Sequence, residues 1–192
     1  MDSAPSSPHL SLEEYRRLEE ESDQRYEYHD GEVFAMAGGE PVHNVISVNT
    51  MVALSNRLAD ENCTVFNSDQ KVRIASVNRS LYPDITVVCG AIERDQEDRR
   101  SITNPILLIE VLSDSTSSYD QGDKFKLYSK LPSLREYLLI SQHEPSVQTY
   151  YRPSATDLWQ MTWSEGLSQS LVLKSLKLEI PLTELYLKTE GL

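Results

Sequence analysis

Two short apolar runs stand out from the mixed pattern of hydrophobic and polar residues in the middle of the chain, at 85–88 and 106–112. Their length and their β-branched residues are typical of strands that are buried on both faces. Each run carries one carboxylate, with Asp84 where the first run begins and Glu110 deep inside the second. Because a buried charge is costly without a partner, the pattern predicts a cation or a metal ion beside these carboxylates.

Hydrophobic periodicity also predicts the elements around these two runs. In the first half of the chain we expect a disordered tail over 1–10, a short helix from the capping box at Ser11 to about Glu21, a hairpin over 25–37 that turns at Asp30-Gly31, a helix from Pro41 to about Asp60, and a strand over 65–75. In the second half we expect a strand over 83–88, a solvated loop over 93–100, a strand over 106–112, a helix from about Ser118 to Leu131, strands over 136–141 and 146–151, antiparallel strands over 157–163 and 171–180, and a terminal helical turn over 181–186.

From 41 to 141 the expected order is helix, strand, strand, strand, helix, strand. It predicts an α/β protein in which the two helices pack on a mixed central sheet. The strands of that sheet are expected at 70–75, 83–88, 106–112 and 136–141. A length of 192 residues without a linker or an internal repeat predicts a single domain over 11–192.

Composition argues against membrane and secreted classes of protein. No apolar run approaches the ~20 residues that a membrane span needs, and no signal-peptide pattern opens the chain. We therefore expect a cytoplasmic protein with no membrane contact. Cys63 and Cys89 lack metal-ligand spacing, and Cys89 ends an apolar run, so buried free thiols are expected rather than a disulfide.

The formal net charge of −12 is unusual for a protein that binds nucleic acid non-specifically. The acidic residues are unevenly distributed, however. Residues 1–40 hold 11 acids and 3 bases, a balance of −8, whereas residues 69–135 hold 10 of each. The central region is therefore neutral, and local attraction of a phosphate group is compatible with the sequence.

Pro83-Asp84 and Glu110-Val111-Leu112, followed by Lys124, resemble the signature of the PD-(D/E)XK nuclease superfamily. More closely, the chain resembles the Uma-type restriction-endonuclease-like proteins. The segments that carry this resemblance are Tyr26-Glu27-Tyr28-His29-Asp30-Gly31-Glu32, Ala35-Met36-Ala37-Gly38-Gly39, His43-Asn44, the frame Tyr119-Asp120-x-Gly122-x-Lys124-x-x-x-Tyr128, and Arg135-Glu136-Tyr137-Leu138-Leu139-Ile140. The resemblance implies a restriction-endonuclease-like core of α-β-β-β-α-β order, with an N-terminal helix and hairpin and a C-terminal antiparallel extension.

The resemblance further implies an endonuclease that cleaves DNA with Mg²⁺ or Mn²⁺. Such hard cations choose carboxylate and carbonyl oxygens, so the implied ligands are Asp84, Glu110 and the carbonyl of Val111. The ion would activate a water molecule and stabilise the departing oxygen. Taken alone, Asp84 after a proline is equally typical of a turn cap.

The lysine of the superfamily pattern stands two residues after the acid, where this chain has Leu112. Two other lysines are candidates for its role, which is to orient or deprotonate the attacking water or to neutralise developing charge. Lys124 lies in the first turns of the next predicted helix, and we prefer it because its frame is part of the resemblance. Lys71 lies one strand earlier, on the same side as Asp69.

Two further residues, Glu27 and His43, are candidates for the edge of the site. Glu27 is expected at the surface unless the hairpin covers the cleft, and a polar residue at a helix start usually caps the helix. Glu110 can also be read without a metal, as one half of a structural ion pair with Lys124 or Arg135.

Three functions therefore stay open at this stage. The first is a metal-dependent nuclease that acts on DNA. The second is a degenerate nuclease fold that serves as a binding module, with Leu112 marking lost catalysis. The third is a metal-dependent hydrolase of a smaller phosphoester, which suits the acidic chain. A homodimer is also expected, because the C-terminal strands hold more large apolar residues than one small sheet can bury. These residues are Tyr150, Tyr151, Trp159, Trp163, Leu171 and Leu173.

Overall fold

The computed structural model describes residues 9–36, 38–113 and 117–190. Most of the predicted disordered tail, residues 1–8, lies outside this described part of the chain. Leu10 differs from that prediction, because its N–H donates to the carbonyl of Gly31 at 2.8 Å and its carbonyl accepts from the Tyr28 hydroxyl at 3.1 Å. The described part of the chain thus begins by hydrogen bonding to the N-terminal hairpin.

The main sheet has six strands in the order β10-β9-β8-β7-β6-β3. The strands are β3 (Cys63–Phe66), β6 (Ile85–Cys89), β7 (Leu107–Leu112), β8 (Glu136–Ser141), β9 (Ser146–Tyr151) and β10 (Gln160–Glu165). β7 and β8 are parallel, whereas the other neighbours are antiparallel, so the predicted mixed sheet is confirmed. The two apolar runs pair directly with each other, with Ile85 opposite Ile109.

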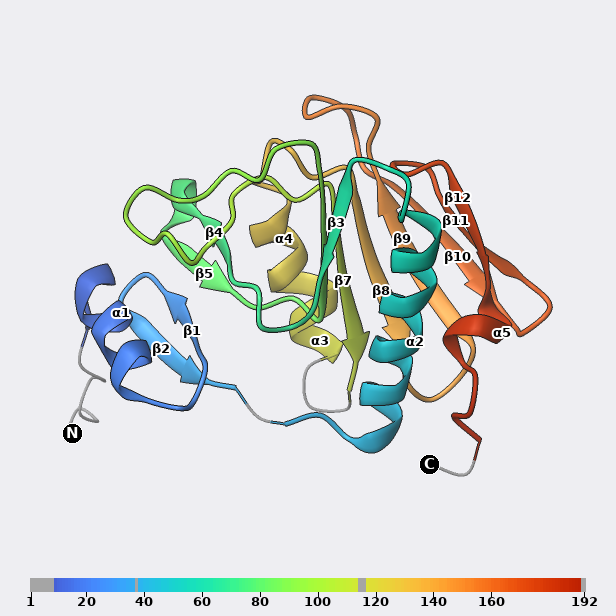
Figure 1. The fold of residues 1–192 in the computed structure, drawn as a ribbon, viewed down its shortest axis with the longest axis horizontal. Coiled ribbons are helices and arrows are strands. Elements are labelled where there is room, and N and C mark those ends of the chain that lie inside the picture. The colour runs from blue at the N-terminus through green and yellow to red at the C-terminus, as the bar shows by residue number, and fades with distance from the viewer. Residues whose placement is uncertain (1–8, 37, 114–116, 191–192) are drawn as a thin grey trace, which may run out of the picture.

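Helices cover both faces of this sheet (Figure 1). Since successive side chains of a strand point to opposite faces, the apolar runs of β7 and β8 feed two separate clusters. One cluster joins α2 (Pro41–Arg57) to the sheet through Ile46, Leu54, Ile109, Val111, Leu138 and Ile140. The other cluster joins the sheet to a second helical segment, which begins at Ser117, and to the turn after it. Its members include Leu108, Tyr128, Leu131, Tyr137 and Leu139.

The second helical segment consists of α3 (Ser117–Tyr119), η2 (Asp120–Lys124) and α4 (Phe125–Tyr128). It was predicted as one regular helix from 118 to 131. The structure instead has a π-helical turn over η2, and the helix ends at Tyr128. A π-turn fits one more residue into a turn than an α-helix does, and such turns are frequent at functional sites.

A smaller sheet in the order β2-β1-β5-β4 lies beside the main one. It contains β1 (Tyr26–His29), β2 (Glu32–Ala35), β4 (Val72–Ile74) and β5 (Arg79–Leu81), and a 3-10 turn, η1 (Ala75–Val77), links the last two. The predicted hairpin turn is confirmed, because Asp30 and Gly31 have φ of 52° and 102°, the left-handed values that this turn requires. Helix α1 (Leu12–Glu21) begins at the capping box of Ser11 and packs its Tyr15 ring on Tyr28.

The predicted strand over 65–75 is wrong as a single element. β3 ends at Phe66, and the backbone N–H groups of Asp69 and Gln70 bond back to Asn67 in a turn. The chain then enters β4, which belongs to the smaller sheet and not to the predicted central sheet. Polar turn residues therefore interrupt a run whose alternation continues on both sides of them.

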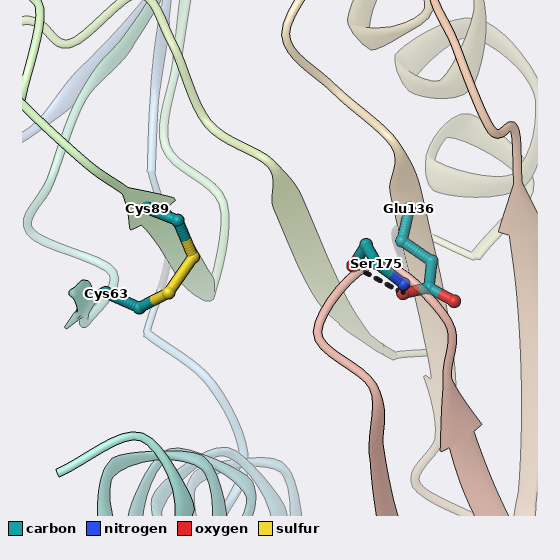
Figure 2. The surroundings of a disulfide bond; sticks show 4 residues. All are labelled: Cys63, Cys89, Glu136 and Ser175. Carbon is teal, nitrogen blue, oxygen red and sulfur yellow. Dashed lines mark hydrogen bonds between the residues drawn. A yellow bond between two sulfur atoms is a disulfide. The ribbon is translucent and has the colours of Figure 1, made fainter. Parts of the chain in front are cut away.

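The C-terminal part also differs from the prediction, because the expected strand over 171–180 is a hairpin. Its strands are β11 (Ser170–Leu173) and β12 (Leu178–Pro181), and α5 (Leu182–Leu185) follows. The buried Glu136 carboxylate anchors this hairpin by accepting from Lys174 N–H at 2.9 Å and from Ser175 N–H at 3.0 Å. Figure 2 shows Glu136 beside Ser175. Among the described helices, none is long and apolar enough to cross a membrane.

Cys63 and Cys89 form a disulfide, so the expectation of free thiols is wrong (Figure 2). The two residues face each other in the register of β3 and β6, with their Cα atoms 4.0 Å apart. A separation of 26 residues does not by itself predict this disulfide, because the two cysteines meet only through the register of β3 and β6. Disulfides are rare in reducing compartments, and the cytoplasmic location stays a prediction.

Candidate functional site

The carboxylate of Asp84 lies where β6 begins, next to the C-terminal half of β7. Its Oδ2 accepts from the backbone N–H of Val111 at 2.7 Å. His43, in the first turn of α2, places its Nε2 3.2 Å from the same oxygen. Continuing the register that pairs Ile85 with Ile109 sets Asp84 across from Glu110. The first turn of α2 and the C-terminal half of β7 thus both contact the Asp84 carboxylate.

Glu110 projects from β7 on the face that the second helical segment covers. It is only 3% exposed, and its Oε1 accepts from the Lys124 ammonium at 3.0 Å and from the Tyr128 hydroxyl at 2.9 Å. Burial raises the pKa of Glu110 well above its usual value, and the nearby charges of Asp120 and Asp84 add to this rise. The charge of Lys124 opposes this rise, so the buried Glu110 carboxylate has the Lys124 ammonium as its compensating cation.

Lys124 lies at the end of the π-turn and is buried among three carboxylates. Besides Glu110, its ammonium lies 3.2 Å from Asp120 Oδ1 and 3.6 Å from Glu27 Oε1. Burial alone lowers the pKa of Lys124, but Glu110, Glu27 and Asp120 outweigh burial and hold that pKa well above its usual value. Lys124 is therefore a permanent positive charge in this cluster.

The smaller sheet closes the site on the side of the hairpin. Glu27 is 8% exposed, so it is not at the surface, because β1 turns its side chain toward Lys124. Its Oε2 lies 3.2 Å from His29 Nε2, and the Tyr119 hydroxyl lies 3.3 Å from that same nitrogen. Burial raises the pKa of Glu27, but its bonds to His29 and the charge of Lys124 prevail, and the pKa lies below its usual value.

The structure does not bring the alternative lysine, Lys71, to this cluster. Lys71 forms an ion pair with Glu19 and another with Asp98, whose Oδ2 is 2.7 Å away. Asp69 pairs with Arg25 at the surface. Lys71 and Asp69 thus serve contacts of α1 and the neighbouring loops.

Leu112 occupies the strand position where the superfamily pattern has its lysine. It packs against the hydrophobic cluster that holds Phe125. Because Glu110 and Leu112 are two residues apart on one strand, they point to the same face. Lys124 comes from the helical segment that packs on that face, which explains how a helix can place an ammonium beside Glu110.

Sequence reasoning missed two contributors, Asp120 and Tyr128. Asp120 stands four residues before Lys124, a separation at which helical side chains meet. Tyr128 stands four residues after Lys124. The frame Tyr-Asp-x-Gly-x-Lys-x-x-x-Tyr already contained both, so helical spacing within that frame was the signal that could have found them.

The donor atoms of this cluster suit a hard divalent cation. Asp84 and Glu110 offer carboxylate oxygens, and His43 offers an imidazole beside them. Asp120 Oδ1 is buried. The Lys124 ammonium lies near it, but no donor of the described residues has the geometry of a hydrogen bond to this oxygen. No group of three or more acidic, histidine or cysteine side chains of the described residues is already arranged to hold a metal ion. A bound ion would therefore need these carboxylates to shift.

The mixed sheet, with facing carboxylates on two neighbouring strands and a lysine beside them, defines the restriction-endonuclease-like class of fold. The chain belongs to the Uma2 family, described as "Putative restriction endonuclease", whose sequence profile matches residues 12–183. It is 38% identical to the uncharacterized protein slr1290 of Synechocystis sp. (strain ATCC 27184 / PCC 6803 / Kazusa), over 95% of both chains. It is 30% identical to a second uncharacterized protein of that organism, sll1609, over 88% of this chain and 95% of that one.

A solved structure has a similar fold. It is described as a putative nuclease belonging to DUF820 from Anabaena variabilis ATCC 29413. The TM-score is 0.68 at 17% identity, and the match covers 86% of this chain and 91% of that chain. At this identity the likeness concerns the fold alone, and the predicted fold class is confirmed.

Replacing Gly39 with alanine is expected to disturb His43. A Cβ at Gly39 would lie 2.7 Å from His43 Nδ1, so the imidazole must move away from Asp84. Burial lowers the pKa of His43, but its bonds to Asp84 outweigh burial and raise that pKa above its usual value. Gly39→Ala should therefore lower the pKa of His43, as followed by NMR titration.

Gly38→Ala is the control, because a Cβ there meets nothing within 4 Å. Equal titration of His43 in both variants and in the wild type would contradict this expectation.

Proposed function

We propose that this protein is a nuclease that cleaves DNA with the help of Mg²⁺ or Mn²⁺. The observation that carries the proposal is the meeting of Asp84 and Glu110 at the paired ends of β6 and β7, beside an imidazole and a permanently charged lysine. Membership of a family described as restriction endonucleases supports a nuclease-like function. Metal dependence and the DNA substrate are our proposal.

In this proposal Asp84, Glu110 and the carbonyl of Val111 hold the ion, which supplies an activated water and a positive charge at the departing oxygen. His43 and the N–H of Val111 fix the Asp84 carboxylate in one orientation. Tyr128 fixes the Glu110 carboxylate in the same way.

Lys124 supplies a positive charge to the phosphate in this proposal. Three carboxylates keep its ammonium protonated, so it suits electrostatic stabilisation better than proton abstraction. Glu27 and Asp120 then act through Lys124, because they hold the ammonium in place. The Tyr119 ring, 5.8 Å from the ammonium, closes the same side.

The substitution Glu110→Gln tests the metal site. Calorimetry with Mn²⁺ should show binding to the wild type and at least ~10-fold weaker binding to the variant, a loss of about 1.4 kcal/mol or more. Glu32→Gln, at an exposed position of the hairpin, is the control and should bind as the wild type does.

Cleavage assays separate the remaining functions. Metal binding together with cleavage of duplex, single-stranded or branched DNA would support the proposal. Metal binding with hydrolysis of small phosphoesters alone would indicate the third function named above. Equal Mn²⁺ binding by Glu110→Gln and by the wild type would contradict the metal site. A wild type that binds Mn²⁺ and cleaves neither DNA nor small phosphoesters would favour a binding module.

Cleavage of both strands of a duplex requires two such sites. We therefore also propose that the protein acts as a homodimer, since most homo-oligomers have two-fold symmetry. Each protomer would then present one site to one strand.

A further inference from the structure

Strand β10 is an uncovered edge of the main sheet. It hydrogen bonds to β9 on one side, and on its other side no strand of the described residues pairs with it. Five of its six residues are exposed, and these lie on both faces of the strand. Met161 and Trp163 are 46% and 54% exposed, and they share one face because they are two residues apart.

The aromatic residues of the C-terminal strands are otherwise used within the protein. The ring of Tyr150 stacks on Phe125 at 4.1 Å, and the ring of Trp159 packs edge-on against that same phenylalanine. Leu171 and Leu173 are buried in the core. Of the six residues that led us to expect a dimer, Trp163 is therefore the exposed one.

The other sheet edges are less suited to pairing. β2, β3, β11 and β12 have four residues each, and β12 ends in Pro181. β4 has three residues and a bridge from Val72 to Ile102. β2 also begins with Glu32, a charge of the kind that protects edges from association. β10 is longer, with six residues, and contains neither proline nor lysine; its one charged residue is Glu165 at its end.

The absence of charge in the middle of β10 indicates that its partner is a second copy of this chain. Two copies of a chain of net charge −12 repel each other overall. The stretch from Leu158 to Ser164, Leu-Trp-Gln-Met-Thr-Trp-Ser, has no charged residue. Two copies can therefore approach along β10 without placing like charges opposite each other in the middle of the strand.

We propose that β10 pairs with β10 of a second copy of this chain, antiparallel across a two-fold axis. An edge strand matches its own copy in this way, because the same backbone groups are presented by both protomers and the contact is closed. The two six-stranded sheets become one continuous sheet, and the two Met161–Trp163 faces lie side by side. Leu158, which is 88% exposed, adds apolar area beside the strand. The proposed interface uses residues of the sheet edge and none of the proposed metal site. Dimerisation through β10 can therefore be tested independently of nuclease activity.

Sedimentation velocity over a range of micromolar concentrations tests the interface. The wild type should be a dimer, and Trp163→Glu should weaken dimerisation at least ~10-fold, because two added carboxylates would face each other without a cation. Val172→Glu is the matched control, because Val172 is also 54% exposed but lies on β11. Circular dichroism and thermal melting of each variant establish that the monomer stays folded.

Mixing charge variants gives a second readout. Trp163→Glu and Trp163→Lys should each be monomeric alone, and an equimolar mixture should recover dimers, because opposite charges then meet across the two-fold axis. A wild type that stays monomeric at tens of micromolar protein would overturn the proposal. So would a dimer that Trp163→Glu leaves intact, because that dimer must use another surface. A folded Trp163→Glu monomer beside a dimeric Val172→Glu is the result that supports β10.

Discussion

Replacing Lys124 with methionine is expected to reduce DNA cleavage by at least ~100-fold, the usual cost of removing one group that stabilises developing charge. The same change should make the folded protein depend on a divalent cation. Without the ammonium, Glu27, Glu110 and Asp120 remain buried together, and breaking a buried ion pair typically costs ~3–5 kcal/mol. Thermal melting with and without Mn²⁺ measures this effect, and Mn²⁺ should raise the melting temperature of the variant more than that of the wild type.

The pH dependence of Lys124→Met gives a separate check. Burial and neighbouring carboxylates already raise the pKa of Glu110, and a carboxyl group with a raised pKa in the folded state favours folding as the pH falls. The stability of the variant should therefore approach that of the wild type in mild acid. Lys126→Met is the control, because Lys126 is exposed and pairs only with exposed Asp123. Wild-type cleavage rates in Lys124→Met would show that Lys124 has no part in the reaction.

Replacing Lys71 with methionine is expected to lower the free energy of unfolding by ~3–5 kcal/mol without any direct effect on the site. Lys71 is 2% exposed, pairs with Glu19 and Asp98, and lies 4.8 Å from the centre of the Tyr15 ring. The change leaves two buried carboxylates without their cation. For a chain of this size the melting temperature should fall by roughly 6–20 °C.

Acid should reduce the difference between wild type and Lys71→Met. Burial raises the pKa of Asp98, but its bonds to Lys71 and Ser101 prevail, and the pKa lies below its usual value. That contribution to wild-type stability is present above the pKa of Asp98 in the unfolded chain, and it is lost as the pH falls. Adding Asp98→Asn and Glu19→Gln to Lys71→Met should recover part of the loss. A melting temperature within 2 °C of the wild type, roughly the effect of 1 kcal/mol or less, would contradict this role.

The parts of the fold that follow from local patterns could be predicted from the sequence. The apolar runs of β6 and β7, the turn at Asp30-Gly31 and the helix from Pro41 each depend on residues within a few positions of one another. The break at Asn67 could not be predicted, because both flanking segments alternate like one strand. The disulfide could not be predicted either, since Cys63 meets Cys89 only through the register of two strands.

The candidate site shows the same division. Asp84 and Glu110 could be paired from the sequence, because Asp84 begins one apolar run, Glu110 lies inside the next, and the two runs are consecutive strands. Glu27 was expected at the surface, because nothing local to the hairpin shows that the smaller sheet turns it toward Lys124. Lys71 was a reasonable alternative by strand order, but its position depends on α1 and on Asp98, which are distant in sequence.

The direction in which Lys124 points depends on the number of residues in the π-turn at η2. Each residue of an α-helix advances the chain by about 100° around the axis, so the extra residue of a π-turn rotates everything after it by that amount. Removing one residue from 120–123 would leave the lysine in the sequence but turn it away from Glu110. A relative with a regular helix at this point must therefore place its cation at a neighbouring helix position or return it to the strand, where this chain has Leu112. Alignments that score the lysine without the length of this turn will misplace the site.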